Sequence, residues 1–240
     1  MPLVCSLAIA ALGVAILVWV ARREHAAVLA GRGAVLDACS PLFDESSLTL
    51  GVDGFPRLEG AIAGHRLILE VIPDTMTVRR LPQLWLSVTL VKRLPLDSGF
   101  AVLVRPTGAE FYSLTHRLEH RLEPPAGLPP EVIARGADRR ATAALALAAP
   151  ALSALFAQPS VKEVGATGRG ARIVFRVAEG RRGPHLLLRQ CAFEDASLAP
   201  ADLVFLHDGL TALCDGLDGQ SERPPLAGKA RGLPDRGAAS

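Results

Sequence analysis

QLWLSVTLVK, at residues 83–92, is the stretch of sequence that decides the fold of this chain. Its large apolar residues alternate with a second set of side chains: Leu84, Leu86, Val88 and Leu90 on one face, and Trp85, Ser87, Thr89 and Val91 on the other. Successive side chains of a β-strand point to opposite faces, so this pattern predicts a strand. We expect residues 100–104 to be its antiparallel partner, because residues 94–99 contain the proline and glycine typical of a connecting loop.

Short runs rich in Leu, Ile and Val precede this strand, at residues 48–50, 58–63 and 66–72. Asp53-Gly54 and Gly64-His65 lie between the runs and are typical of tight turns. Together with the two strands above, these runs predict an antiparallel sheet of about five strands over residues 48–106.

The second half of the chain begins after a proline-rich loop at residues 123–130. Alanine dominates residues 138–157, which predicts a helix that Pro150 splits or kinks. Three further strands are expected at residues 161–164, 171–177 and 184–191, with a hairpin turn at 179–183.

The last predicted element is a helix at residues 200–217. Its leucines recur at spacings of three and four: Leu203, Leu206, Leu210, Leu213 and Leu217. Such a stripe is typical of a helix face packed on a sheet, because a coiled-coil seam needs three to four heptads. Strands grouped before helices therefore predict an α+β class with a mostly antiparallel sheet and two or three packing helices.

An apolar segment at residues 3–20, LVCSLAIAALGVAILVWV, contains no charged residue and no proline. At ~1.5 Å of rise per residue, a helix over residues 3–21 spans close to ~30 Å, the thickness of bilayer hydrocarbon. A cleaved signal peptide needs a basic n-region and a small-x-small cleavage site, and neither is present before Arg22. We therefore expect an uncleaved transmembrane helix that binds the lipid bilayer.

The cations near this segment predict its orientation. Arg22, Arg23 and Arg32 all follow the apolar run, and no Lys or Arg precedes it. The positive-inside rule then places the N-terminus outside and the domain in the cytoplasm, at the cell (inner) membrane. Cys39, Cys191 and Cys214 lie far apart without a CxxC pattern, which agrees with a reducing compartment.

These features divide the chain into segments. The expected organisation is an anchor at residues 1–21, a helical juxtamembrane linker at 22–47, an α+β domain at 48–217 with possible halves at 48–123 and 131–217, and a disordered tail at 218–240. The tail is rich in Gly, Pro, Arg, Ala and Ser and has almost no large apolar residue.

Composition argues against nucleic-acid binding. The formal net charge is only +2, and the chain contains 8 Phe, 2 Trp and 1 Tyr. A basic patch interleaved with stacking aromatic residues is therefore not expected. The sequence also identifies no small-molecule ligand and no cofactor.

One motif with chemical meaning lies in the middle of the chain. His116, Glu119 and His120 form the pattern H-x-x-E-H, in which two histidines on one helical face bind zinc and the glutamate activates water. Glu194 follows at a separation similar to that in the insulinase and pitrilysin family, and the resemblance covers only residues 116–120 and this one distant acid. Two other interpretations are a short amphipathic helix with a polar side, and an edge strand running into Pro124.

Two other groups of residues have an ordinary structural interpretation. The glycine-rich residues 165–170 precede a predicted strand, not a helix, so they predict a hairpin turn and not a phosphate loop. His65, His185 and His207 have no partner at a metal-binding spacing. We therefore assign no catalytic, cofactor-binding or metal-binding residue from the sequence.

Residues 58–104, with Asp74-Thr75 and the segment L-P-x-L-W-L at 81–86, resemble uncharacterised bacterial single-pass membrane-anchored proteins. The resemblance implies an anchored protein and no particular activity. The sequence favours a non-enzymatic protein whose domain binds another protein or the membrane surface. Two alternatives stay open: a membrane-tethered zinc metallohydrolase that uses residues 116–120, and an accessory subunit of a larger membrane complex.

Overall fold

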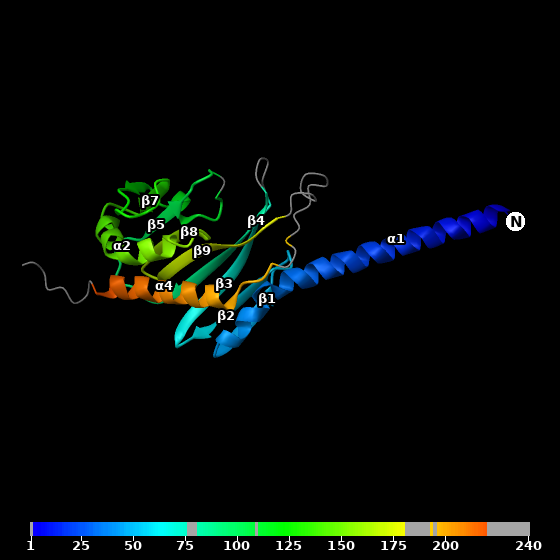
Figure 1. Cartoon of the computed structure of the whole chain (residues 1–240), viewed down its shortest axis with the longest axis horizontal. Helices are drawn as coiled ribbons and strands as arrows, with labels where there is room; N and C mark the ends of the chain where they lie inside the picture. The colour runs from blue at the N-terminus through cyan, green and yellow to red at the C-terminus, as the bar shows by residue number, and fades with distance from the viewer. Residues whose placement is uncertain (1, 76–80, 109, 181–192, 194–195, 220–240) are drawn as a thin grey trace, which may run out of the picture.

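The computed structural model describes residues 2–75, 81–108, 110–180, 193 and 196–219, except for the side chains of residues 2–11, 24 and 25. The helices are α1 (Pro2–Gly33), η1 (Ala34–Leu42), η2 (Leu114–Arg117), α2 (Ala141–Phe156) and α4 (Pro200–Asp218), where η marks a 3-10 helix. The strands are β1 (Glu45–Leu50), β2 (Pro56–Ile62), β3 (His65–Asp74), β4 (Gln83–Val91), β5 (Phe100–Val104), β6 (His120–Leu122), β7 (Val132–Gly136), β8 (Val161–Thr167) and β9 (Gly170–Glu179). Figure 1 shows a domain of sheet and helices from which α1 projects as a long rod.

The strands of the described residues form one antiparallel sheet in the order β1-β2-β3-β4-β9-β8-β5-β7-β6. The predicted strand at residues 83–92 is confirmed as β4, which lies inside the sheet between β3 and β9. Its two apolar faces are explained by this position, since most of β4 is buried. The α+β class with a large antiparallel sheet is confirmed.

The predicted partner of β4 was wrong. β5 pairs with β7 and β8, and β9 takes the place beside β4 that we expected β5 to occupy. β9 has ten residues and pairs along the whole of β4, whereas β5 has only five. The longer pairing satisfies more backbone hydrogen bonds. Strands from the two possible halves, 48–123 and 131–217, consequently share one sheet.

The helices α2 and α4 lie side by side on one face of this sheet (Figure 1). The leucine stripe of α4 is completely buried there, from Leu203 to Leu217, which confirms a helix packed on a sheet. Pro150 does not split the predicted helix, because α2 runs through it. Pro150 and Ala146 are both exposed, so water can satisfy the carbonyl that the missing N–H leaves unpaired.

The helix α1 continues without a break from the predicted anchor to Gly33, and η1 follows directly at Ala34. The described apolar side chains of its outer part point into the surroundings: Leu12, Val14, Ile16, Leu17, Val18, Trp19 and Val20 are all exposed. Among the side chains that are described, no helix is both long enough and apolar enough to cross a bilayer. The predicted span at residues 3–20 is covered only in part, because the side chains of residues 3–11 lie outside the described set.

Three further predictions fall largely outside the described residues. They are the strand at 184–191, the turn at 179–183 beyond Gly180, and the disordered tail beyond Gly219. The hairpin turn predicted at residues 165–170 is confirmed, since β8 ends at Thr167 and β9 begins at Gly170.

Candidate functional site: a cationic pocket

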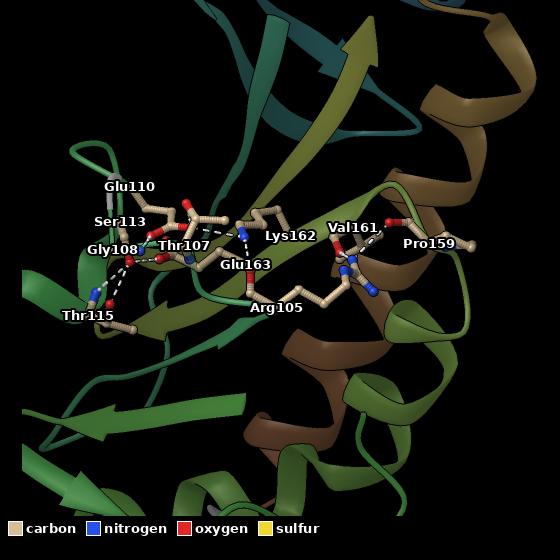
Figure 2. Close-up of polar contacts among 10 residues, drawn as sticks. All are labelled: Arg105, Thr107, Gly108, Glu110, Ser113, Thr115, Pro159, Val161, Lys162 and Glu163. Atoms are coloured by element: carbon tan, nitrogen blue, oxygen red, sulfur yellow. Dashed lines mark hydrogen bonds and ion pairs between the residues drawn. The ribbon is translucent and has the colours of Figure 1, made fainter. Parts of the chain in front are cut away.

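A bulge in β8 brings two charged residues to the face of the sheet opposite α2 and α4. Val161 pairs with Phe175 and Glu163 pairs with Val174, so Lys162 is an extra residue in the strand. A bulge breaks the strict alternation of side chains. Lys162 and Glu163 therefore both face the segment at residues 105–115, as Figure 2 shows.

Lys162 forms a buried ion pair with Glu110. Its Nζ lies 3.0 Å from Glu110 Oε1 and also donates a hydrogen bond to the Arg105 carbonyl. Glu110 accepts further hydrogen bonds from the N–H and hydroxyl of Thr107, both at 2.7 Å, and from the N–H of Gly108 at 3.0 Å. The carboxylate is thus saturated with donors, as a buried charge requires.

These donors decide the protonation state of Glu110. Burial by itself raises the pKa of a carboxyl, but the hydrogen bonds from Thr107 and Lys162 outweigh it and lower the pKa of Glu110 to about 2. Glu110 is therefore ionised at neutral pH and pairs with the Lys162 side chain.

Glu163 organises a second cluster beside the first. It accepts hydrogen bonds from the Ser113 hydroxyl and from the Leu114 N–H, and it pairs with Arg172 at 2.6 Å. Arg172 also donates to the Tyr112 carbonyl. The segment at residues 110–115, which has little regular structure, is thereby fixed onto the sheet (Figure 2).

Arg105 connects the end of β5 to the loop before β8. One terminal nitrogen, Nη2, donates to the carbonyls of Pro159 and Val161 at 2.8 and 2.7 Å. Its backbone has φ of +48°, in the left-handed region that residues other than glycine rarely adopt. Such strain persists only where the surrounding contacts enforce it, and it is common at functional sites.

A pocket of about 210 Å³ opens between these elements. Its walls are Gln83, Trp85, Arg105, Thr107, Pro159, Ser160, Lys162 and Arg176. Trp85 and Arg176 are cross-strand neighbours on β4 and β9, next to a register shift in β4, and the Arg176 N–H donates to the Ser160 carbonyl at 2.8 Å. The pocket therefore lies across three adjacent strands of the sheet.

The pocket walls are rich in hydrogen-bond donors. Three lining residues are cations, two carry hydroxyls and one carries an amide, and no acidic residue is among the lining residues of the described chain. The Trp85 N–H is buried and has no hydrogen-bond partner among the described residues. Chemically, such walls bind and orient a ligand that carries acceptor atoms.

The residues of the H-x-x-E-H motif do not share a helical face. His116 lies in η2, Glu119 in the connection that follows, and His120 in β6, the edge strand of the sheet. The interpretation as an edge strand is the one that the structure supports, and all three side chains are exposed. The His120 Nδ1 lies 3.1 Å from the Ala137 carbonyl oxygen. No cluster of three metal-binding side chains occurs within the described residues, and Glu194 lies outside them.

The structure brings together two histidines that sequence spacing left isolated. His65 Nδ1 lies 3.1 Å from His207 Nε2, and His207 Nδ1 lies 3.0 Å from Asp208 Oδ1. The two histidines are 142 positions apart in the chain, so no local pattern predicts their contact.

Sequence analysis also missed the residues of the cationic pocket. One signal was present: Lys162 and Glu163 are consecutive charges inside an otherwise apolar run that we expected to be a strand. Charged residues are rarely buried unless they are paired, so two neighbouring ones in a buried strand indicate a polar network. Nothing in the sequence indicated Arg105, Glu110 or Arg176.

Comparison with known proteins yields no relative: no family model, curated protein or solved structure matches this chain. The resemblance of residues 58–104 to bacterial membrane-anchored proteins therefore stays a prediction.

Proposed function

We propose that this chain is a single-pass membrane-anchored binding module, in which residues 3–20 cross the inner membrane and the α+β domain engages a partner at the membrane surface. The uncharged sequence of residues 3–20 supports the anchor. The donor-rich pocket supports a role in binding.

The observation that carries this proposal is the exposure of the apolar side chains along the outer part of α1. Leu12, Leu17 and Trp19 are 62%, 69% and 60% exposed on a helix whose contacts with the domain are concentrated at η1. Moving a fully exposed leucine out of water is worth about 1.5–3 kcal/mol. A row of such side chains therefore favours a lipid environment strongly.

The proposed orientation rests on Arg22, Arg23 and Arg32, which follow the apolar segment. Cations flanking a transmembrane helix stay on the cytoplasmic side. Trp19, beside Arg23 on the helix, occupies the position of an interfacial aromatic residue. The N-terminus then lies outside and the domain inside the cell.

Membrane fractionation tests the anchor. We expect the full chain, produced in bacterial cells, to remain in the membrane pellet after an alkaline wash. The double variant Leu12→Arg/Ile16→Arg should appear in the wash, because two arginines in the bilayer core cost about 5–7 kcal/mol on insertion scales. A matched control, Val91→Arg/Val204→Arg, places the same charges at exposed apolar positions of the domain and should stay in the pellet. Release of the unaltered chain by the wash would refute the anchor.

Protease protection tests the orientation. An epitope added at Ser240 should be protected in intact spheroplasts and cleaved after lysis, whereas an epitope before Met1 should be cleaved in both. The reverse pattern would place the domain outside the cell and would contradict the orientation while leaving the anchor in place.

A further inference from the structure

We propose that the pocket lined by Arg105, Lys162 and Arg176 binds a phosphate group. This inference concerns the domain alone and does not depend on the anchor. The observations behind it are the charge of the pocket walls, the availability of their donors, their fixed geometry and the size of the space.

Charge is the first argument. The lining includes three cations and no carboxylate among the described residues, and Glu110 neutralises Lys162 from behind. Two positive charges are left on the walls. They match the two negative charges of a phosphate dianion better than the single charge of a carboxylate.

The second argument is that the necessary donors are available. Among the described residues, the Arg176 guanidinium makes no hydrogen bond and no ion pair, although it is partly buried. Within the part of the chain that the structure describes, Arg105 uses only its Nη2, for the carbonyls of Pro159 and Val161, so Nη1 and Nε remain for a ligand. Guanidinium groups bind phosphate oxygens through paired, charge-assisted hydrogen bonds.

The geometry of the walls is fixed before a ligand arrives. Two backbone carbonyls hold the Arg105 guanidinium, and Glu110 with the Arg105 carbonyl holds the Lys162 ammonium (Figure 2). Side chains that are already ordered lose little conformational entropy when they bind. The left-handed backbone at Arg105 fits this role, because the contacts that hold the side chain also maintain the strained backbone.

The size of the pocket suits a single phosphate group. The pocket volume of about 210 Å³ corresponds to about seven water molecules at ~30 Å³ each. Pockets for drug-sized ligands measure about 300–1,000 Å³. A tetrahedral phosphate with a few waters fits, and its several oxygens can reach cations on different walls. The hydroxyls of Thr107 and Ser160 add neutral donors at the rim.

Two sources provide the same group: inorganic phosphate in solution and the phosphate of an anionic lipid headgroup. We would titrate the full chain in a neutral detergent with inorganic phosphate by isothermal titration calorimetry, at constant ionic strength set by sodium chloride. Saturable binding with one site per chain is expected.

The variant Arg176→Gln should weaken phosphate binding about tenfold or more, because a charge-assisted hydrogen bond is lost. The matched control Arg66→Gln changes an exposed arginine on β3 and should bind phosphate as the unaltered chain does. Arg176 makes no side-chain bond among the described residues, and the Arg66–Glu59 ion pair is an exposed one that contributes little stability. Both variants should therefore keep the same far-ultraviolet circular dichroism and nearly the same melting temperature.

A second arm identifies the source. The full chain in nanodiscs of phosphatidylcholine alone is compared with nanodiscs that also contain phosphatidic acid. Weaker free-phosphate binding in the nanodiscs that contain phosphatidic acid than in those of phosphatidylcholine alone assigns the lipid headgroup as the source. Equal free-phosphate binding in the two kinds of nanodisc assigns soluble phosphate. Absence of saturable phosphate binding in detergent, or equal affinity of Arg176→Gln, overturns the proposal. Neither result depends on the membrane fractionation that tests the anchor.

Discussion

The ammonium group of Lys162 lies 3.0 Å from the carboxylate of Glu110, and the two side chains are only 6% and 1% exposed. This ion pair joins β8 to the segment that follows β5, and it places a cation in the wall of the pocket. The pair therefore serves the stability of the domain and the geometry of the pocket at once.

Removing one member of the pair should destabilise the domain. We expect Glu110→Gln or Lys162→Met to lower the free energy of unfolding by about 3–5 kcal/mol, because each leaves the other group buried without its partner. Urea unfolding monitored by circular dichroism measures the loss. The double variant Glu110→Gln/Lys162→Met should lose less than the sum of the two single losses. Single losses below about 1 kcal/mol would show that the pair is hydrated in solution.

The stability of the domain should fall in acid because of Glu110. Its pKa is about 2 in the folded protein against an ordinary value of 4.5. A lowered pKa contributes stability above the unfolded value, and this contribution is lost as the pH falls from about 4.5 to about 2. The loss is about 3 kcal/mol by the conversion of 1.36 kcal/mol per pKa unit. Urea unfolding at several pH values measures it, and Glu110→Gln should remove this part of the pH dependence. An identical acid loss in both proteins would contradict the assignment.

Two glycines with positive φ should respond differently to alanine. At Gly170, with φ of +140°, an added Cβ would lie 2.1 Å from the Leu90 carbonyl oxygen, whereas at Gly64, with φ of +79°, it meets open space. We expect Gly64→Ala to cost about 1 kcal/mol from backbone strain alone. Gly170→Ala should cost clearly more, because β4 and β9 must separate there to accept the methyl group. Thermal unfolding compares the two variants, and equal melting temperatures would show that the hairpin moves freely.

The thiols of Cys39 and Cys214 should resist alkylation in the folded protein. Burial raises the pKa of each thiol to about 11, and Cys39 also donates a hydrogen bond to the Leu198 carbonyl. At pH 8 the reactive thiolate is then on the order of one part in a thousand. Peptide mass spectrometry after N-ethylmaleimide treatment should find both cysteines unmodified until urea is added. Rapid labelling of the native chain would indicate local opening of η1 or α4.

Local patterns predicted the elements of this fold well. The alternation at residues 83–92 and the leucine stripe of α4 each repeat with the period of the structure they form, and both were confirmed. The pairing of the strands was harder to predict from the sequence. Whether β5 or β9 lies beside β4 depends on competing alignments between segments far apart in the chain, and short apolar runs do not distinguish them.

The candidate site was harder still to predict from the sequence. H-x-x-E-H was the most specific local motif, but its helix did not form, since His120 joins the edge of the sheet as β6. The pocket residues came from three strands and two loops, and none of them forms a motif in the sequence. Only the neighbouring charges Lys162 and Glu163 indicated a buried polar network.

The sequence by itself determined most of the helices and strands, although not β7, together with the position of the apolar segment of residues 3–20 and the α+β composition of the domain. Hydrophobic periodicity and turn residues carry that information locally. Only the tertiary structure decided that Arg105, Lys162 and Arg176 surround one space and that Glu110 holds Lys162 in place. The reason is physical: a bulge in β8 and the order of strands in the sheet fix these contacts, and both depend on pairing between distant parts of the chain.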